Sequence, residues 1–490
     1  MEAKRFPVAI FILVLGLVFG PGAVAQAGAQ AANSAGLFCD LFTLFGASSR
    51  PGIGPGYALT GEDISAFAER PAVLSAGFFL KRGWFEASMA LDLHQDIGAW
   101  LMGGSWSNLP KAPDSWSLMW GNNYPQVGYA QASGDSWLVS AGRRRIGVGP
   151  GTYGLGTSSE NPWYDHVLAR VEAPVGSGTI GYSFTTFGAQ RFGDIKKKNL
   201  FLHRAYWRSR YLSIAFGEFN LLVGDSIDLQ DIGPFLVYHH LFNSNSNVML
   251  ELEIQARPAE ALRLYGEFVL DDFQIPGEGS ESNPNAMGFM GGLEWRILSG
   301  ARSARPAFFR ADHGLRLDAA PLELRTGDSS GGLRLKAETW LASTYLYRRS
   351  LASIAESWTG RYFFHSSTAL GYQVVEPFFA SPLGPDTWLN RLELSWNEGK
   401  VESLIAVEYR VQGAESERRD YSPPYSSYWL GPQEPVSRRL DFVLGVMYAP
   451  SDRIILTGKA ALSFREAETR MSIDAGFGYR FGVGAIRRPR

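Results

Sequence analysis

Apolar and polar residues alternate with a period of two along many stretches of this chain, and no other feature constrains its fold as strongly. The last stretch, 469–481, shows the pattern most clearly. Its apolar residues are Met471, Ile473, Ala475, Phe477, Tyr479 and Phe481, and the residues between them are Ser472, Asp474, Gly476, Gly478 and Arg480. Successive side chains of a β-strand point to opposite faces, whereas one face of a helix repeats about every 3.6 residues. The pattern therefore predicts β-strands with one apolar face.

The predicted strands are long enough to cross a lipid bilayer. Alternation alone fits both a soluble β-sandwich and a membrane β-barrel, because each has one apolar and one polar face. The stretches 438–449, 453–465 and 469–481 exceed the roughly 9–11 residues that a tilted membrane strand needs, while soluble strands average about 5–6. We therefore predict an all-β fold, a transmembrane antiparallel β-barrel of about 16–18 strands with long extracellular loops. The predicted strands at 304–311 and 361–369 have the weakest alternation.

Short turns alternate with long connections along the chain. The short turns are 133–135, 174–177, 209–210, 258–260, 398–400 and 450–452, and the long connections are 144–166, 188–199, 220–246, 270–285, 298–332, 348–386 and 412–437. Outer-membrane barrels have this arrangement, with short periplasmic turns and long extracellular loops. We therefore expect the protein in the cell outer membrane, with outer-membrane lipid and the barrel-assembly machinery as partners.

The first residues have the pattern of a secretory signal peptide. Lys4 and Arg5 precede an apolar run over 7–19, and Ala23-Val24-Ala25 fits the small-x-small cleavage pattern. The predicted organisation is a signal peptide over 1–25, a periplasmic leader or plug over 26–72, the barrel over 73–481 and a basic C-terminal tail over 482–490. Within the leader, Thr60 followed by Asp63 predicts the cap of a short helix over 61–69.

Composition and charge argue against several other classes of protein. The formal net charge of −2 gives no electrostatic basis for nucleic-acid binding. The single cysteine, Cys39, excludes an intramolecular disulfide. The histidines are scattered and do not form a compact group with Ser and Asp, so we expect no enzyme activity and no cofactor. Asp225, Asp228 and Asp231 are spaced by three, while a calcium loop places its ligands at every second position. We therefore expect no metal site.

A glycine-rich stretch and a set of charged residues describe the interior of the predicted barrel. The stretch Gly149-Pro150-Gly151, followed by Gly154 and Gly156, lacks the Lys-Ser/Thr pair of a phosphate-binding loop. Glycines let a loop pack closely against a wall, so we predict that this loop folds into the lumen.

The charged residues predicted to face the lumen are Arg391, Glu393, Glu402, Glu408, Arg410, Lys459, Arg465, Asp474 and Arg480. They either pair across strands or line a polar channel, and both can hold.

Five short motifs follow one another between residues 120 and 275. They are Gly142-Arg143-Arg144-Arg145-Ile146-Gly147-Val148-Gly149-Pro150-Gly151, Ser158-Ser159-Glu160-Asn161-Pro162-Trp163-Tyr164, His203-Arg204, Leu212-Ser213-Ile214-Ala215-Phe216-Gly217-Glu218 and Leu264-Tyr265-Gly266-Glu267-Phe268-Val269-Leu270-Asp271-Asp272-Phe273. Their order and spacing resemble the Wzi capsule-assembly family of outer-membrane barrels. The resemblance implies a large barrel that acts as a lectin and holds capsular polysaccharide at the cell surface. The chain departs from the family pattern at Val148-Gly149, where the family usually has a Trp.

Aromatic residues in the long connections are the candidate ligand-binding residues. They are Trp163, Tyr164, Tyr421, Tyr425, Tyr428 and Trp429. Because the apolar CH faces of sugar rings pack on aromatic rings, the stretch 421–429 predicts carbohydrate binding in an extracellular loop. The alternative interpretation is that these rings close the loop over the barrel mouth.

Taken together, these features predict a protein that binds surface polysaccharide or helps to organise the cell surface. A porin for small solutes and an adhesin with long binding loops are the alternatives. An open lumen favours the porin, whereas a lumen sealed by the connections 144–166 and 220–246 favours the binding role.

Overall fold

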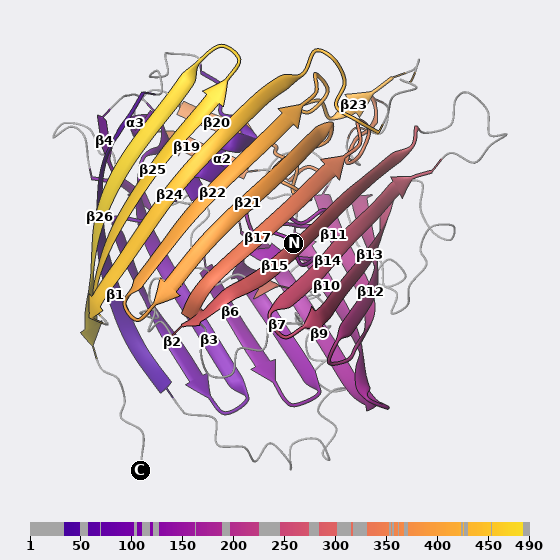
Figure 1. Ribbon diagram of the computed structural model, residues 1–490, viewed down its shortest axis with the longest axis horizontal. Coiled ribbons are helices and arrows are strands. Elements are labelled where there is room, and N and C mark those ends of the chain that lie inside the picture. The colour runs from indigo at the N-terminus through magenta and orange to yellow at the C-terminus, as the bar shows by residue number, and fades with distance from the viewer. Residues whose placement is uncertain are drawn as a thin grey trace, which may run out of the picture.

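The computed structural model describes most of the chain as one closed sheet (Figure 1). The described residues are 34–49, 57–68, 70–101, 105–109, 118–120, 127–161, 163–188, 197–224, 246–273, 284–300, 315–316, 331–351, 354, 357–360, 362–366, 371–422, 425, 430–451 and 453–483. The predicted signal peptide, the predicted strand 304–311 and most of the predicted C-terminal tail lie outside them. No helix within these ranges has the length and apolar composition to span a membrane.

Eighteen of the described strands form a closed antiparallel barrel, as the sequence predicts. They are β1 (Ser34–Ser48), β2 (Leu74–Arg82), β3 (Phe85–Gln95), β6 (Val127–Ser133), β7 (Trp137–Arg144), β9 (Tyr164–Val175), β10 (Gly178–Gly188), β11 (Lys197–Arg208), β12 (Leu212–Gly224), β13 (Ser246–Ala259), β14 (Leu262–Asp272), β15 (Ala286–Gly300), β17 (Gly331–Ala342), β21 (Thr387–Glu398), β22 (Val401–Gln412), β24 (Ser437–Ser451), β25 (Ile454–Arg465) and β26 (Thr469–Val483). The short strands β4 (Ser105–Ser107) and β5 (Leu118–Trp120) extend the same sheet.

The first strand closes the barrel and corrects the prediction for residues 26–72. Strand β1 pairs with β2 on one side and with β26 on the other, so it belongs to the wall and not to a leader or plug. Its inward residues Phe42 and Leu44 are buried with Ile455, while Leu37 and Phe45 are exposed on the outer face. Both faces of the strand are therefore apolar, which removes the alternation by which the other strands were predicted.

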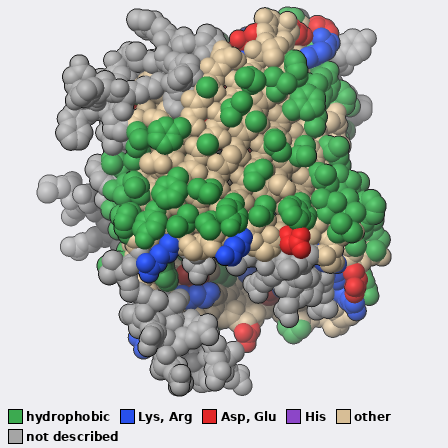
Figure 2. Space-filling view, turned by 60° about the vertical axis from the view of Figure 1, so that its left-hand side comes forward, with side chains coloured by type: hydrophobic (Ala, Val, Ile, Leu, Met, Phe, Trp, Pro, Cys, Tyr) green, Lys and Arg blue, Asp and Glu red, His purple; other side chains and the backbone are tan. Residues whose placement is uncertain are grey.

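The outer surface of the barrel is apolar. Leu392, Ile405, Leu444 and Ile473 are about half exposed there, and Figure 2 shows hydrophobic side chains over the outer face with charged groups gathered at its upper and lower edges. An apolar band between two polar rims matches the hydrocarbon core of a bilayer. The apolar faces predicted from the alternation thus face lipid, and the polar faces line the lumen.

The hairpin turns at one end of the barrel are short, as predicted. Gly83, Gly176 and Gly399 lie in the turns that join β2 to β3, β9 to β10 and β21 to β22, with φ of +57°, +58° and +59°. Two-residue hairpin turns require positive φ, a conformation that glycine adopts without steric cost. The first residues of β1 and the last residues of β26 also lie on this side of the barrel, because the closed ring has an even number of strands.

The predicted helix in the N-terminal region forms inside the barrel as α2 (Gly61–Ala68). Its apolar side packs Ile64 and Phe67 against Ile97 and Leu101 of α3 (Ile97–Leu101). The same cluster contains Val375 of β20 (Gly371–Val375), which pairs with β19 (Tyr362–Ser366). The prediction of a barrel strand at 361–369 is therefore wrong. This stretch is one strand of a separate two-stranded hairpin, so its strand structure was predicted but its place in the barrel wall was not.

The glycine-rich loop folds into the lumen, as predicted, and forms part of a plug. We use the word plug for the described residues of the loops 145–163 and 343–386. Leu155 of the first loop and Tyr347 and Trp358 of the second are fully buried against the inner faces of β9–β17. Glycine is required at Gly156, where a Cβ would lie 2.3 Å from Cζ of Phe219, and at Gly149, where φ is +93°. One side of the lumen is therefore filled by a packed core.

A buried ion-pair network stabilises the wall behind the plug. Arg204 of β11 pairs with Glu251 at 3.2 Å and also with Glu253, both on β13, and all three side chains are at most 1% exposed. The Gln255 amide donates a hydrogen bond to Glu253 at 2.6 Å. Arg204 is the ion-pair partner of both carboxylates, so the network depends on this one side chain.

Candidate functional site

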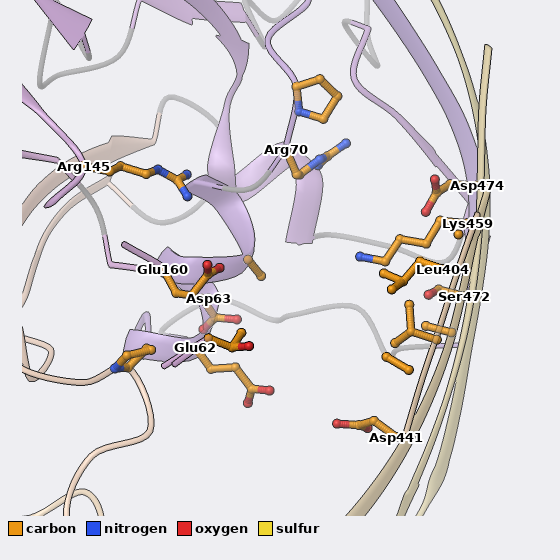
Figure 3. A pocket seen from close by; sticks show the side chains of 18 of the residues that line it. Glu62, Asp63, Arg70, Arg145, Glu160, Leu404, Asp441, Lys459, Ser472 and Asp474 are labelled. Carbon is orange, nitrogen blue, oxygen red and sulfur yellow. The ribbon is translucent and has the colours of Figure 1, made fainter. Parts of the chain in front are cut away.

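A cavity of about 2230 Å³ occupies the part of the lumen that the plug leaves open. Figure 3 shows its two sides: Glu62, Asp63, Arg145 and Glu160 lie on one side, and the barrel wall with Asp441, Lys459 and Asp474 lies opposite. All nine of the charged residues that the sequence predicted to face the lumen line this cavity.

The cavity runs along the whole membrane-spanning height of one wall. The residues of β22 that line it include Glu402 near the short-turn end and Gln412 at the long-loop end, together with Glu408 and Arg410 between them. A tilted strand needs roughly 9–11 residues to cross the hydrocarbon core of a bilayer. The described residues that line the cavity therefore extend along this strand from near one membrane interface to near the other.

Three arginines form a row across this wall. Arg410 of β22 lies directly opposite Arg439 of β24, and Arg439 lies directly opposite Arg465 of β25. Like charges at directly opposed positions repel each other, so the row needs counter-charges. Glu408 pairs with Arg410 at 2.7 Å and Asp441 pairs with Arg439 at 2.7 Å. We call Arg410, Arg439 and Arg465 the arginine row.

Helix α2 places a further carboxylate on the arginine row. Glu62 pairs with Arg439 and, at 3.2 Å, with Arg465. The helix is held in position by its cap, as predicted: the Asp63 N–H donates to Thr60 Oγ1 at 3.2 Å, and the Thr60 N–H donates to the Asp63 carboxylate at 3.0 Å. Tyr57 also donates its hydroxyl to Asp63 at 2.9 Å. The cap orients the first turn of the helix so that Glu62 faces the barrel wall.

The arginine row keeps Glu62 ionised at acidic pH. The position of Glu62 inside the barrel, where it is partly removed from bulk water, would by itself raise the pKa of this side chain, but the guanidinium groups of Arg439, Arg465 and Arg410 outweigh this effect and lower the pKa from 4.5 to about 2. A carboxylate with a lowered pKa stabilises the folded state fully above its ordinary pKa, and this contribution is lost as the pH falls through the lowered value.

We therefore expect the stability difference between the wild type and E62Q to be constant from pH 7 to pH 5. It should shrink progressively as the pH falls from about 4.5 toward about 2, the interval between the two pKa values of Glu62. Urea unfolding of both proteins in lipid vesicles across this range measures the difference. A difference that has already vanished at pH 5 would contradict the ion pairs of Glu62.

Glutamate side chains of the barrel wall hold the plug in place. The N–H groups of Leu155 and Gly156 donate to Glu267 at 3.0 and 3.2 Å. Tyr153 donates its hydroxyl to Glu408 at 3.0 Å, so the plug also contacts a residue beside the arginine row. The hydrogen bonds to Glu267 thus fix the plug against the wall, and the hydrogen bond to Glu408 fixes it at the edge of the open side of the lumen.

The structure separates the aromatic residues that the sequence grouped together. Trp163 lines the cavity, and the guanidinium of Arg145 lies 5.9 Å from its ring. Tyr164 points the other way, is buried, and donates its hydroxyl to the carbonyl of Phe379 at 2.8 Å. Tyr421 is buried and packs edge-on against Tyr425, with ring centroids 5.7 Å apart. Tyr428 and Trp429 lie outside the described residues.

Tyr421 and Tyr425 belong to a cluster of packed tyrosine rings. Tyr345 contacts both Tyr421 and Tyr425, with ring centroids 5.6 and 5.9 Å away. Sequence reasoning did not select Glu62 or Arg439 as site residues. Arg439 lies on a strand that was predicted, but its place in the arginine row depends on the register between strands, which the sequence does not show.

Comparison with known proteins identifies the fold. No protein-family model and no curated protein sequence matches the chain. Wzi of Escherichia coli, described as an outer-membrane protein involved in group 1 capsule assembly and a carbohydrate-binding β-barrel, matches at a TM-score of 0.51 with 12% identity, over 94% of this chain and 87% of Wzi. OprD of Pseudomonas aeruginosa matches at a TM-score of 0.42 with 9% identity, over 94% of this chain and 98% of OprD. The chain is an outer-membrane β-barrel protein whose closed 18-stranded fold is similar to that of Wzi.

Proposed function

We propose that this protein is a partly plugged outer-membrane barrel that binds a polar saccharide, such as a segment of a surface polysaccharide, in the open side of its lumen. The observation that supports this proposal most directly is the cavity between the plug and the wall of β21–β26. Binding sites for small molecules combine a concave surface, a few aromatic rings and polar groups at fixed positions. This cavity has Trp163 and Tyr57 among its lining residues, beside arginines and carboxylates held by ion pairs.

The likeness to a carbohydrate-binding barrel favours a saccharide as the ligand class. Hydroxyl groups of a sugar both donate and accept hydrogen bonds, so a lining of mixed charge suits them. The proposed partners are therefore outer-membrane lipid around the barrel and a surface polysaccharide in the cavity. The proposal includes no catalytic step and no cofactor.

Trp163 is the residue whose loss tests the saccharide site. We expect W163A to bind oligosaccharides about tenfold more weakly than the wild type, the effect expected for an aromatic residue at the centre of a binding site. Calorimetric titration of the refolded proteins with a panel of neutral and acidic oligosaccharides measures this. W388A is the matched control, because Trp388 is exposed on the outer face of β21. Equal binding by the wild type and W163A, or binding by neither, would contradict the proposal.

A porin is the second candidate, because the cavity follows β22 across the membrane. A porin of this kind would pass small sugars through the open side of the lumen without saturation. Swelling of liposomes that contain the protein separates the two functions. Swelling whose rate increases linearly with sugar concentration and falls with sugar size favours the porin, whereas saturable binding without swelling favours the saccharide-binding barrel.

A further inference from the structure

We propose that the arginine row is a binding site for the oxyanion group of an acidic ligand, and that Glu62 of α2 occupies this site until the ligand displaces it. The proposal rests on the proposed function and names the ligand class more closely, as a saccharide that carries a carboxylate or a phosphate. In the structure, the carboxylate of Glu62 stands in for the carboxylate or phosphate of that ligand.

Positive charge is concentrated at one level of the barrel wall. Arg410, Arg439 and Arg465 occupy opposed positions on three neighbouring strands, so their backbones place three guanidinium groups side by side. Cross-strand neighbours lie about 4.5–5.5 Å apart at Cβ, and like charges at this distance destabilise a sheet. We therefore expect an anion to bind beside this row, because it offsets the repulsion between the three arginines.

One of the three described carboxylates that pair with the row comes from outside the barrel wall. Glu408 and Asp441 come from the same strands as Arg410 and Arg439 and form permanent parts of the wall. Within the described residues, Glu62 is the carboxylate that pairs with Arg465, and it comes from a different element. Guanidinium groups bind carboxylate and phosphate through two parallel N–H donors, so an anion that displaces Glu62 can take its place on Arg439 and Arg465.

Glu62 lies where a ligand in the cavity can displace its side chain. Its side chain is 55% exposed even though it lies inside the barrel, because it projects into the cavity. The opposite side of α2 is anchored by Ile64 and Phe67 in a separate apolar cluster. A ligand in the cavity can therefore reach the arginines from the side that Glu62 leaves open. Displacing the carboxylate does not require the apolar contacts of the helix to break.

The test compares a charge removed at the row with a charge removed elsewhere in the same cavity. E62Q removes the internal carboxylate and keeps the shape of its side chain. E402Q is the matched control: Glu402 lines the same cavity near the short-turn end of β22, away from Arg410, and accepts a hydrogen bond from the Asn397 amide at 3.2 Å. The probes are glucuronate, glucose 6-phosphate and neutral glucose, titrated into the folded proteins at low ionic strength, where charge interactions are least screened.

We expect E62Q to bind glucuronate and glucose 6-phosphate about tenfold more tightly than the wild type, since hydrogen bonds between charged groups typically have this effect or more. E402Q should bind these probes as the wild type does, and the double variant E62Q/R465Q should lose the gain in affinity seen in E62Q. The affinity for glucose should not change in any variant. Heat-modifiable migration on gels verifies that each barrel is folded.

Three outcomes would overturn the inference. An equal gain in E62Q and E402Q would mean that the total charge of the cavity, and not the row, controls binding. Unchanged affinity for both acidic probes in E62Q, together with oligosaccharide binding that depends on Trp163, would remove the anion site and leave the proposed function standing. No binding of acidic probes or oligosaccharides by any variant would remove both.

Discussion

Replacing Gly156 by valine is expected to displace the plug from the barrel wall and to increase the ion conductance of the protein. A Cβ at this position would lie 2.3 Å from Cζ and 2.4 Å from Cε2 of Phe219, whose ring is fully buried. Overpacking of a dense core costs about 1–3 kcal/mol. The displaced loop also loses the hydrogen bonds that Leu155 and Gly156 donate to Glu267, which leaves that buried carboxylate without these donors.

Single-channel recording in planar bilayers measures this effect. The wild type should give conductance steps well below those of an open barrel with as many strands, because the plug fills one side of the lumen. G156V should give clearly larger steps or frequent transitions to a larger state. G458V is the control, because a Cβ at Gly458 meets nothing within 4 Å. If folded G156V and G458V conduct as the wild type does, the plug does not restrict the lumen.

Replacing Arg204 by methionine is expected to destabilise the barrel by about 3–5 kcal/mol, because it leaves the buried carboxylates of Glu251 and Glu253 without their partner. Urea unfolding in lipid vesicles, with m-values compared between variants, gives the free energy of unfolding. The triple variant R204M/E251Q/E253Q should recover much of the loss, since removing a whole buried network is less costly than breaking it.

An ion pair on the rim supplies the control for Arg204. Arg438 and Glu466 lie 3.4 Å apart with both side chains more than half exposed. Exposed pairs contribute about 0–1 kcal/mol, so R438M should leave the free energy of unfolding nearly unchanged. Equal effects of R204M and R438M would mean that the network around Arg204 does not stabilise the wall.

The sequence predicts those strands whose two faces meet different surroundings. The predicted strand 401–411 corresponds to β22, because Ile405 faces lipid while Glu408 and Arg410 face the cavity. The sequence fails at β1, where Phe42 faces inward and Phe45 faces outward. Alternation records a difference in polarity between two faces, so it vanishes where the lumen side is packed with apolar groups.

The candidate site is harder to predict, because its residues come together only through register and through the folding of loops. Arg410 and Arg465 were predicted to face the lumen, but Arg439 joins them only in the register that the barrel adopts. A shift of one residue would turn Arg439 toward lipid. The loop aromatics were predicted as one group, but Trp163 lines the cavity while the neighbouring Tyr164 of β9 is buried against the plug.

The central claim is that one side of the lumen is filled and the other is open to polar solutes, and thiol labelling tests it most directly. Two alanines provide a matched pair in a background with Cys39 replaced by serine: Ala461 of β25 lines the cavity, and Ala342 of β17 is fully buried against the plug. A small charged thiol reagent should modify the folded A461C barrel rapidly and leave A342C unmodified until the protein is unfolded. Equal modification of both positions, or protection of both, would contradict the division of the lumen.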